Sequence, residues 1–397
     1  MNPAAFFARH VAGLLLGTAG LLVCGAAPAQ AARGVVPGVS ADSVLIGQSA
    51  KISGSAGTVA GRQYRDGLLL AFSATNQAGG VHGRRIDLAT LDDQNDPAKA
   101  LANTRTLIDD RRVFALAGYT FTNNVRAALP LLRESGVPLV GAYTGMPELY
   151  DGSQPLVFAL RASYADELAT MIRHVDTVGY DQVAMVHYTN PLGVELHGDV
   201  TERLRRIGRG LVASGAMPVN APDYLAAARG AVQPLLQRCP KLVILGVSGR
   251  DAAAIVQGMA ASACPPARFM GRNIVDIALL QQTLGEAARG VIITQVVPNP
   301  SRGVHPLVSE YRAQLKQRDP RARPDFAEFE GYIAGRCLVL ALQRAGRELN
   351  RAGFVKALET VSLEGPDRFR IQFGAGRRVG SRYTNIVMVS DKERITD

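Results

Sequence analysis

Short apolar segments alternate with amphipathic helices along most of this chain, and the alternation runs through two successive series. The first series predicts strands at 44–47, 86–91, 113–117 and 137–141. The second series predicts strands at 182–186, 210–216, 241–246, 268–272 and 291–294. Strand–helix alternation is typical of parallel sheets covered by helices on both faces. The sequence therefore predicts an α/β fold with two doubly wound parallel-sheet lobes.

The last quarter of the chain does not continue the alternation. Helices dominate residues 305–360, and two isolated strands are predicted near 369–373 and 384–390. These elements do not make a third sheet, so they must complete the first two. A chain that crosses between lobes more than once forms a hinge. We expect lobe 1 to comprise residues 32–160 plus 298–368, and lobe 2 to comprise residues 161–297 plus 369–397.

The first residues have the features of an export signal. Arg9 and His10 precede an apolar run, Val11–Val23, whose 13 residues are too short to cross ~30 Å of hydrocarbon. The small-x-small pattern at Ala29–Ala31 then predicts a signal peptide over residues 1–31, cleaved after Ala31. The alternative is a lipid on Cys24, although the residue before it is Val rather than a small residue.

After the signal peptide, no apolar stretch reaches 18 residues. We therefore expect a soluble protein, secreted across the cytoplasmic membrane into the periplasm. Three cysteines would remain, namely Cys239, Cys264 and Cys337. Cys239 and Cys264 each precede a predicted strand of the second series, and equivalent ends of neighbouring parallel strands are close. The sequence predicts a disulfide between these two, the alternative being two free thiols, and a buried thiol at Cys337.

The formal net charge is +10, and the chain has no Trp. Few aromatic residues argue against a surface that stacks on sugars or single-stranded nucleic acid. Arginines cluster at 203–209 and at 318–323, but no nucleic-acid reader motif accompanies them. We interpret these clusters as a solvated or partner-facing surface, and we expect no nucleic-acid partner.

Candidate ligand-binding residues follow the predicted strands, because open parallel sheets bind ligands beyond the carboxyl ends of their strands. In the first lobe these positions are Ser53, Tyr119, Thr120, Thr122, Tyr143, Thr144 and Gly145. Thr122 is placed to cap the next helix, where a hydroxyl and free backbone N–H groups favour a carboxylate. An ordinary capped helix and a tight turn are the alternatives. The glycines after Ser53 match neither a dinucleotide fingerprint nor a phosphate loop, and we expect no cofactor.

In the second lobe the corresponding candidates are Tyr188, Ser248 and Asn273. Each is as well explained by an ordinary loop. Enzyme signatures are missing: there is no Gly-x-Ser-x-Gly elbow, and no Cys or His spacing indicates a metal site. The pair Asp92-Asp93 is interpreted as loop caps rather than an acid–base dyad. We expect no catalytic activity, with an exported α/β hydrolase as an alternative.

Several segments, in order, resemble the type I periplasmic solute-binding proteins of ABC transporters, the branched-chain amino-acid-binding family. The matching segments are Asn76–Ile86, Leu91–Pro97, Gly136–Val140, Leu160–Tyr164 and Glu330–Tyr332. The resemblance covers nearly all of residues 40–392. It implies two lobes joined by three crossovers, which close on a small-molecule ligand and deliver it to an inner-membrane ABC permease. We expect a monomer. A sensory ligand-binding protein of the same fold is the alternative.

The resemblance also implies roles for particular residues. Thr122, with Thr120 nearby, would bind the ligand carboxylate, and Thr144 and Gly145 would add hydroxyl and main-chain contacts. The chain departs from amino-acid binders at Leu192, where they have Tyr, and at Asn273, where they often have an acid. Asp276 lies one helical turn further on. A buried ammonium without a carboxylate is costly, so the sequence favours a carboxylate-bearing or neutral solute, an amino acid remaining possible.

Overall fold

The computed structural model describes residues 36–53, 59–390 and 395–396. The predicted signal peptide, its cleavage site and Cys24 lie outside these residues. Along the described chain, no helix is both long and apolar enough to cross a membrane.

Five parallel strands form the first sheet, in the order β2-β1-β3-β4-β5. They are β1 (Ser43–Ala50), β2 (Arg85–Asp92), β3 (Ala115–Ala117), β4 (Leu139–Val140) and β5 (Val157–Phe158). Side chains alternate along a strand, so Val44 and Ile46 of β1 pack on one face and Leu45 on the other.

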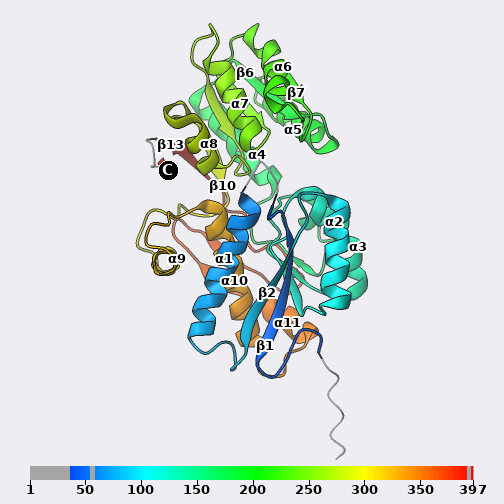
Figure 1. The fold of residues 1–397 in the computed structure, drawn as a ribbon. Coiled ribbons are helices and arrows are strands. Elements are labelled where there is room, and N and C mark those ends of the chain that lie inside the picture. Colours follow the sequence, from blue (N-terminus) through cyan, green and yellow to red (C-terminus); the bar gives the residue numbers. More distant parts are fainter. Residues whose placement is uncertain (1–35, 54–58, 391–394, 397) are drawn as a thin grey trace, which may run out of the picture. The chain divides into compact units, whose positions relative to one another are not determined.

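Helices cover both faces of this sheet, as Figure 1 shows. α1 (Ala60–Gln77) and α10 (Phe326–Ala345) pack with Val44 and Ile46. The opposite face carries α2 (Pro97–Arg105), the π-helical turn η1 (Thr106–Asp110) and α3 (Thr122–Ser135). A short 3-10 turn, η2 (Pro147–Leu149), follows β4. The first predicted doubly wound unit is therefore confirmed.

Seven strands form the second sheet, in the order β14-β13-β10-β9-β8-β6-β7. They are β6 (Val183–Tyr188), β7 (Leu211–Met217), β8 (Leu242–Gly246), β9 (Arg268–Gly271), β10 (Ile292–Gln295), β13 (Asn385–Val389) and β14 (Ile395–Thr396). All pairs are parallel except β10–β13 and β13–β14.

Helices cover both faces of the second sheet as well. α4 (Tyr164–Val178) and α5 (Pro191–Arg206) pack on one face. α6 (Tyr224–Leu236), α7 (Gly249–Ala260) and α8 (Ile277–Leu284) pack on the other, with the 3-10 turn η3 (Gly285–Ala288) after α8. The second predicted doubly wound unit is thus also present.

The chain passes between the two sheets three times. It leaves the first sheet after β5 and returns after β10, where α9 (Pro306–Arg318), α10 and α11 (Arg351–Glu359) add to the first core. A hairpin of β11 (Ser362–Glu364) and β12 (Arg370–Gln372) follows. The chain then enters the second sheet at β13. The last quarter of the chain therefore completes both sheets' cores, as the sequence predicted.

The last of these passages lies later in the chain than residue 369, where the sequence placed it. Phe369, Ile371 and Phe373 are buried in the first core, beside residues of α10 and α11. Residues 378–380 then run along Ala159, whose N–H donates to the Arg378 carbonyl at 2.8 Å and whose carbonyl accepts from the Gly380 N–H at 2.8 Å. The chain therefore crosses between Gly380 and β13, because an apolar hairpin first fills the first core.

α1 and α10 lie side by side (Figure 1) and approach with their backbones almost in contact. A Cβ atom at Gly331 would lie 2.1 Å from the carbonyl oxygen of Tyr64 on α1. Only glycine fits at this position without moving a helix. The glycine in the Glu330–Tyr332 segment, which is part of the family resemblance, is therefore explained by the close packing of α1 and α10.

A buried ion pair lies beside the first passage between the sheets. Arg161, only 2% exposed, follows β5, and its Nε lies 3.6 Å from Oε1 of Glu330 on α10. Its guanidinium also stacks on the ring of Tyr143, 4.5 Å from the ring centre. The positive charge is thus balanced by a carboxylate from the helix that closes the first core.

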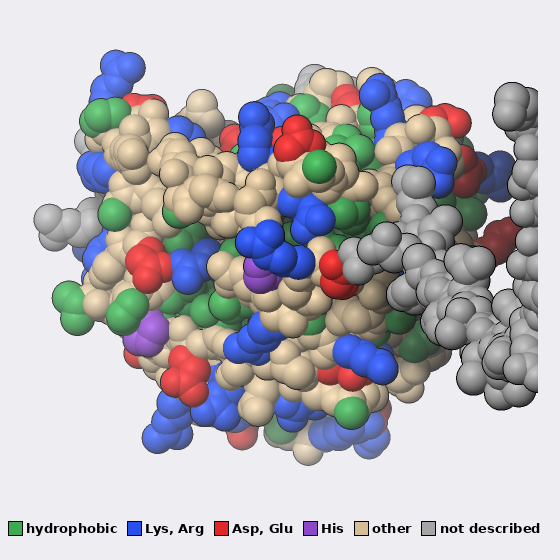
Figure 2. Space-filling model, turned by 90° about the horizontal axis from the view of Figure 1, so that it is seen from below, with side chains coloured by type: hydrophobic (Ala, Val, Ile, Leu, Met, Phe, Trp, Pro, Cys, Tyr) green, Lys and Arg blue, Asp and Glu red, His purple; other side chains and the backbone are tan. Residues whose placement is uncertain are grey.

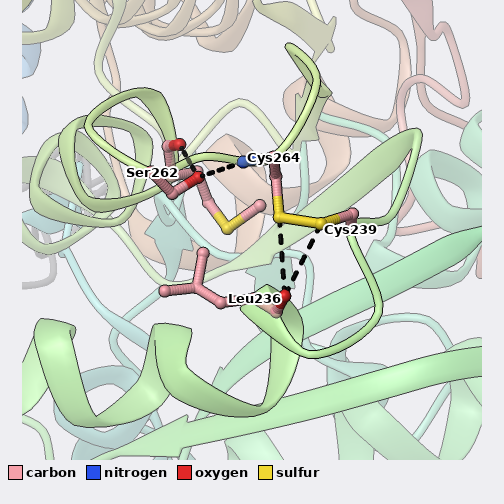
Figure 3. The surroundings of a disulfide bond; sticks show 5 residues. Leu236, Cys239, Ser262 and Cys264 are labelled. Atoms are coloured by element: carbon pink, nitrogen blue, oxygen red, sulfur yellow. Dashed lines mark hydrogen bonds between the residues drawn. A yellow bond between two sulfur atoms is a disulfide. The ribbon is translucent and has the colours of Figure 1, made fainter.

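Cys239 and Cys264 form the predicted disulfide, with Cα atoms 5.2 Å apart. Both sulfur atoms lie 3.5 Å from the carbonyl oxygen of Leu236 at the end of α6 (Figure 3). The bond ties the loop before β8 to the loop before β9. Cys337 is free and buried in α10, as predicted, and burial raises the pKa of its thiol to about 12.

Basic side chains on the surface are interspersed with acidic ones. On the face shown in Figure 2, Lys and Arg side chains are spread among Asp and Glu side chains and uncharged surface. In the cluster at 203–209, Glu202 accepts from Arg205 at 2.8 Å and from Arg206 at 3.0 Å. These contacts fit a solvated surface.

Replacing Cys239 and Cys264 together by serine should lower the free energy of unfolding by about 3 kcal/mol, because the bond closes a loop of 25 residues in the unfolded chain. Urea denaturation followed by circular dichroism measures the change. Reductant should lower the midpoint of the parent protein and leave that of the double variant unchanged. Equal midpoints for parent and variant without reductant would contradict the expectation.

Asp325 predicts a pH dependence of stability. It caps α10 by accepting from the Glu328 N–H at 3.0 Å, and burial, with Asp276 and Glu328 nearby, raises its pKa to about 7. The folded state therefore binds a proton that the unfolded state releases near pH 4. This contribution to stability is full at acidic pH and is lost as the pH rises to about 7.

Asp325→Asn keeps a capping oxygen and cannot ionise. We therefore expect the melting temperature of the variant to fall less than that of the parent between pH 5 and pH 8. Differential scanning calorimetry across this range measures the difference. Identical pH profiles would show that Asp325 does not titrate there.

Candidate functional site

The loops after the strands of both sheets line one cavity of about 140 Å³. From the first sheet come Lys51 after β1, Phe121, Thr122 and Asn123 after β3, and Tyr143 after β4. From the second sheet come Tyr188, which ends β6, and Asn190 and Leu192 after it. Val247 and Ser248 follow β8, and Arg272 and Ile274 follow β9. Tyr164 begins α4 between the two sets. The cavity thus lies where parallel α/β sheets bind ligands.

Three hydroxyl groups meet at one wall of the cavity. Thr122 Oγ1 lies 2.8 Å from Thr144 Oγ1 and 2.9 Å from the Tyr164 hydroxyl, and the last two lie 3.1 Å apart. The sequence expected Thr122 to cap α3, but it is the first helical residue and its hydroxyl makes no cap contact. Phe121 precedes it with φ 67°, and this turn directs the start of α3 at the cavity.

The opposite wall is also held by hydrogen bonds. The Tyr188 hydroxyl donates to Asp251 Oδ2 at 2.7 Å, lies 3.3 Å from Ser248 Oγ, and accepts from the Ser248 N–H at 3.2 Å. Asp251 Oδ1 lies 3.8 Å from Nε of Arg250, and burial raises the pKa of Asp251. Arg250 also stacks on Tyr224 at 4.2 Å. Asp251 is therefore engaged by the protein's own groups.

Two further cations line the cavity. Lys51 follows β1, and its pKa is lowered by burial and by the neighbouring charges of Arg250 and Arg62. Arg272 follows β9 and stacks on the ring of Tyr164, 4.1 Å from its centre. With Arg250, three cations face one carboxylate among the described lining residues, so the electrostatics favour an anionic ligand.

Four of the predicted site residues line the cavity, namely Thr122, Tyr143, Tyr188 and Ser248. Thr144 reaches it through its hydrogen bonds to Thr122 and Tyr164. Gly145 lies beneath Tyr164, whose N–H donates to the Gly145 carbonyl at 2.9 Å. The structure thus brings these six residues together from both sheets.

The other four predicted residues do not line it. Ser53 donates to Asp92, in agreement with the prediction of a loop cap there. Tyr119 is fully buried against Thr104, 3.1 Å away, and Thr120 Oγ1 accepts from the Lys51 N–H at 3.2 Å. Asn273 lines a separate space of about 30 Å³, and its N–H donates to Glu167 at 3.0 Å.

The sequence analysis missed Lys51, Tyr164, Arg250 and Arg272. Arg272 and Lys51 directly follow a strand, so the rule that selected Asn273 and Ser53 could have found them one or two residues earlier. Tyr164 begins a helix rather than ending a strand, and no local pattern predicts its place in the cavity. No histidine lies among the described lining residues, and no three metal-ligating side chains gather in the described chain.

Two doubly wound sheets that share a cavity at their strand ends define a two-lobed α/β binding protein. The model of the periplasmic binding protein family matches residues 43–394, and the chain belongs to that family. It is a substrate-binding protein related to those of branched-chain amino acids.

Relatives and solved structures agree with this assignment. The Leu/Ile/Val-binding protein of Citrobacter freundii is 23% identical over 313 residues, which are 77% of this chain and 81% of that protein. A possible leucine/isoleucine/valine-binding protein from Rhodopirellula baltica superposes with a TM-score of 0.81 and 26% identity, over 90% of this chain and 96% of that one. A substrate-binding periplasmic protein from Ralstonia solanacearum has a TM-score of 0.79 and 28% identity, over 89% and 99%.

Gly145→Ala should disturb the hydroxyl wall. A Cβ atom there would lie 2.6 Å from the backbone nitrogen of Tyr164, so Tyr164 must move, at a cost of about 1–3 kcal/mol in folding stability. Gly198→Ala in α5 is the control, because a Cβ there meets nothing within 4 Å. Urea denaturation should show a loss for Gly145→Ala alone. Equal midpoints for the two variants would refute the close packing at Gly145.

Proposed function

We propose that this protein is the substrate-binding component of an ABC importer, which captures a small carboxylate-bearing or neutral organic solute and passes it to an inner-membrane permease. The observation that carries this proposal is the cavity lined by strand-end loops of both sheets. A solute bound there contacts both halves of the molecule, so its binding favours their closure. Binding and release of this kind need no catalytic group.

The three passages of the chain between the sheets support a hinge. We propose that one lobe comprises residues 36–160 and 298–380, and that the other comprises residues 161–297 and 381–390. The boundary at 380 follows from the hydrogen bonds of Arg378 and Gly380 with Ala159. If the two lobes rotate about these three connecting segments, Tyr188 and Ser248 move toward Thr122 and enclose the solute.

Export to the periplasm fits this role, with residues 1–31 as the cleaved signal. The disulfide supports this location, because such bonds persist in oxidising compartments outside the cytosol. The relative from Ralstonia solanacearum is named as a periplasmic protein. A single chain suffices for the cavity, so we propose a monomer.

A thermal-shift screen of amino acids, aromatic acids and dicarboxylates tests the proposal, because a solute that binds only the folded state raises the melting temperature. Thr122→Val removes one cavity hydroxyl and should weaken the binding of the best solute roughly 10-fold, as expected for a lost hydrogen bond to a charged group. Calorimetry measures the affinity.

Thr104→Val is the matched control. Thr104 is as buried as Thr122, but its hydroxyl bonds to Tyr119 and to the Ala100 carbonyl, away from the cavity. This variant should lose stability and keep its affinity. If no solute shifts the melting temperature, or if a purified sample chemically converts its solute, the proposed function is wrong.

A further inference from the structure

Arg272 is a buried cation that has no anionic partner among the residues the structure describes. Its side chain lines the cavity, yet the residue is only 7% exposed. Within the described part of the chain its guanidinium makes no hydrogen bond and no ion pair, and it stacks on the face of the Tyr164 ring. Arg161, buried to a similar degree, has Glu330 beside it. A desolvated guanidinium normally has such a partner.

Among the described residues that line the cavity, no acidic side chain is free to pair with Arg272. Asp251 is the one carboxylate among the described lining residues, and it already contacts Tyr188 and Arg250. The segment 54–58, which precedes α1, reads Gly-Ser-Ala-Gly-Thr and has no ionisable side chain. The missing anion is therefore expected to come from the ligand.

The position of Arg272 suits a carboxylate. Its guanidinium lies over the ring of Tyr164, whose hydroxyl bonds to Thr122 and Thr144. One aromatic ring thus carries a cation on its face and a group of hydroxyls at its edge. Guanidinium and hydroxyl donors arranged on one wall are typical of carboxylate recognition.

The rest of the cavity is small and lined by apolar side chains together with the amides of Asn95, Asn123, Asn190 and Asn220. Its apolar side chains include Phe121, Leu192, Leu196, Val219, Val247 and Ile274. A volume of about 140 Å³ is close to the roughly 150 Å³ of a cavity that holds one benzene molecule. The space suits one ring or one short branched chain.

We propose that Arg272 binds the carboxylate of a compact, apolar monocarboxylate that has no ammonium group. This inference rests on the proposed function and names its substrate class. An α-ammonium group in the same cavity would face three cations, and the carboxylate of Asp251 is held by Tyr188 and Arg250. The site therefore favours a simple organic acid over the amino acid with the same carbon skeleton.

Two matched sets of compounds separate the possibilities. Isovalerate, isovaleramide and valine share a branched skeleton, and phenylacetate, phenylacetamide and phenylglycine share an aromatic one. In each set the amide lacks the negative charge and the amino acid adds an ammonium. With the parent protein, calorimetry should show that at least one of the two acids binds roughly 10- to 100-fold more tightly than the corresponding amide and amino acid bind.

Variants of Arg272 test the residue itself. Arg272→Gln should weaken binding of that acid roughly 10- to 100-fold and bring its affinity close to that of the amide. Arg272→Lys keeps a charge and should retain part of the preference. Arg85→Gln removes an exposed arginine, 71% exposed and paired with Asp87, and should leave the affinity unchanged. If Arg272→Gln does not fold, the comparison of acid, amide and amino acid in the parent decides.

The outcomes distinguish this inference from the proposed function. If valine or phenylglycine binds as tightly as its acid, or an amide does, the inference fails and the importer role stands. If an acid binds the parent and Arg272→Gln equally, Arg272 is not its partner and the inference also fails. If no compound of these sets or of the wider screen binds, the proposed function fails with it.

Discussion

A guanidinium ion withdrawn from water must be matched by negative charge, and this constraint shapes both the frame and the cavity. At Arg161 the chain supplies its own match, since Glu330 reaches it from α10. That pair joins the first passage between the sheets to the helix that closes the first core. At Arg272 the described chain supplies an aromatic ring and no carboxylate. Arg161 therefore stabilises the fold, and we propose that Arg272 binds the solute.

Most of the fold could be predicted because the spacing of apolar residues agrees with the residues that begin and end helices and strands. At the start of α2, Asp96 accepts from the Ala98 N–H at 2.8 Å and Pro97 is the first helical residue, a pattern that marks a helix start in sequence. The buried strands of the second series were equally clear. β5 was missed because it has only two residues, too few to show the alternation of apolar side chains that marks a strand. The boundary predicted at 369 differs from the crossing after Gly380, because a strand pattern does not reveal which core its apolar side will join, and Phe369 lies in the first core.

The site was predictable only in part, for a related reason. The rule that ligands bind beyond strand ends found Thr122, Tyr143, Tyr188 and Ser248, which lie in the cavity. It could not say which residue of a loop points inward, so Asn273 was chosen and its neighbour Arg272 overlooked. Tyr164 depends on contacts between segments far apart in sequence. Such placements are set by tertiary packing, which a single sequence does not show.

The order in which the chain visits the two sheets constrains how it can acquire its structure. The first core lacks α10 until residue 345 has been made, and the second sheet lacks β13 until residue 389. Synthesis proceeds from the N-terminus, so the face of the first sheet that α10 covers and the edge of the second sheet that β13 pairs are completed late, whereas the opposite faces are covered by earlier helices. The complete fold therefore forms late, a property that would suit the export we propose, because a chain must be unfolded to pass through a narrow translocation channel.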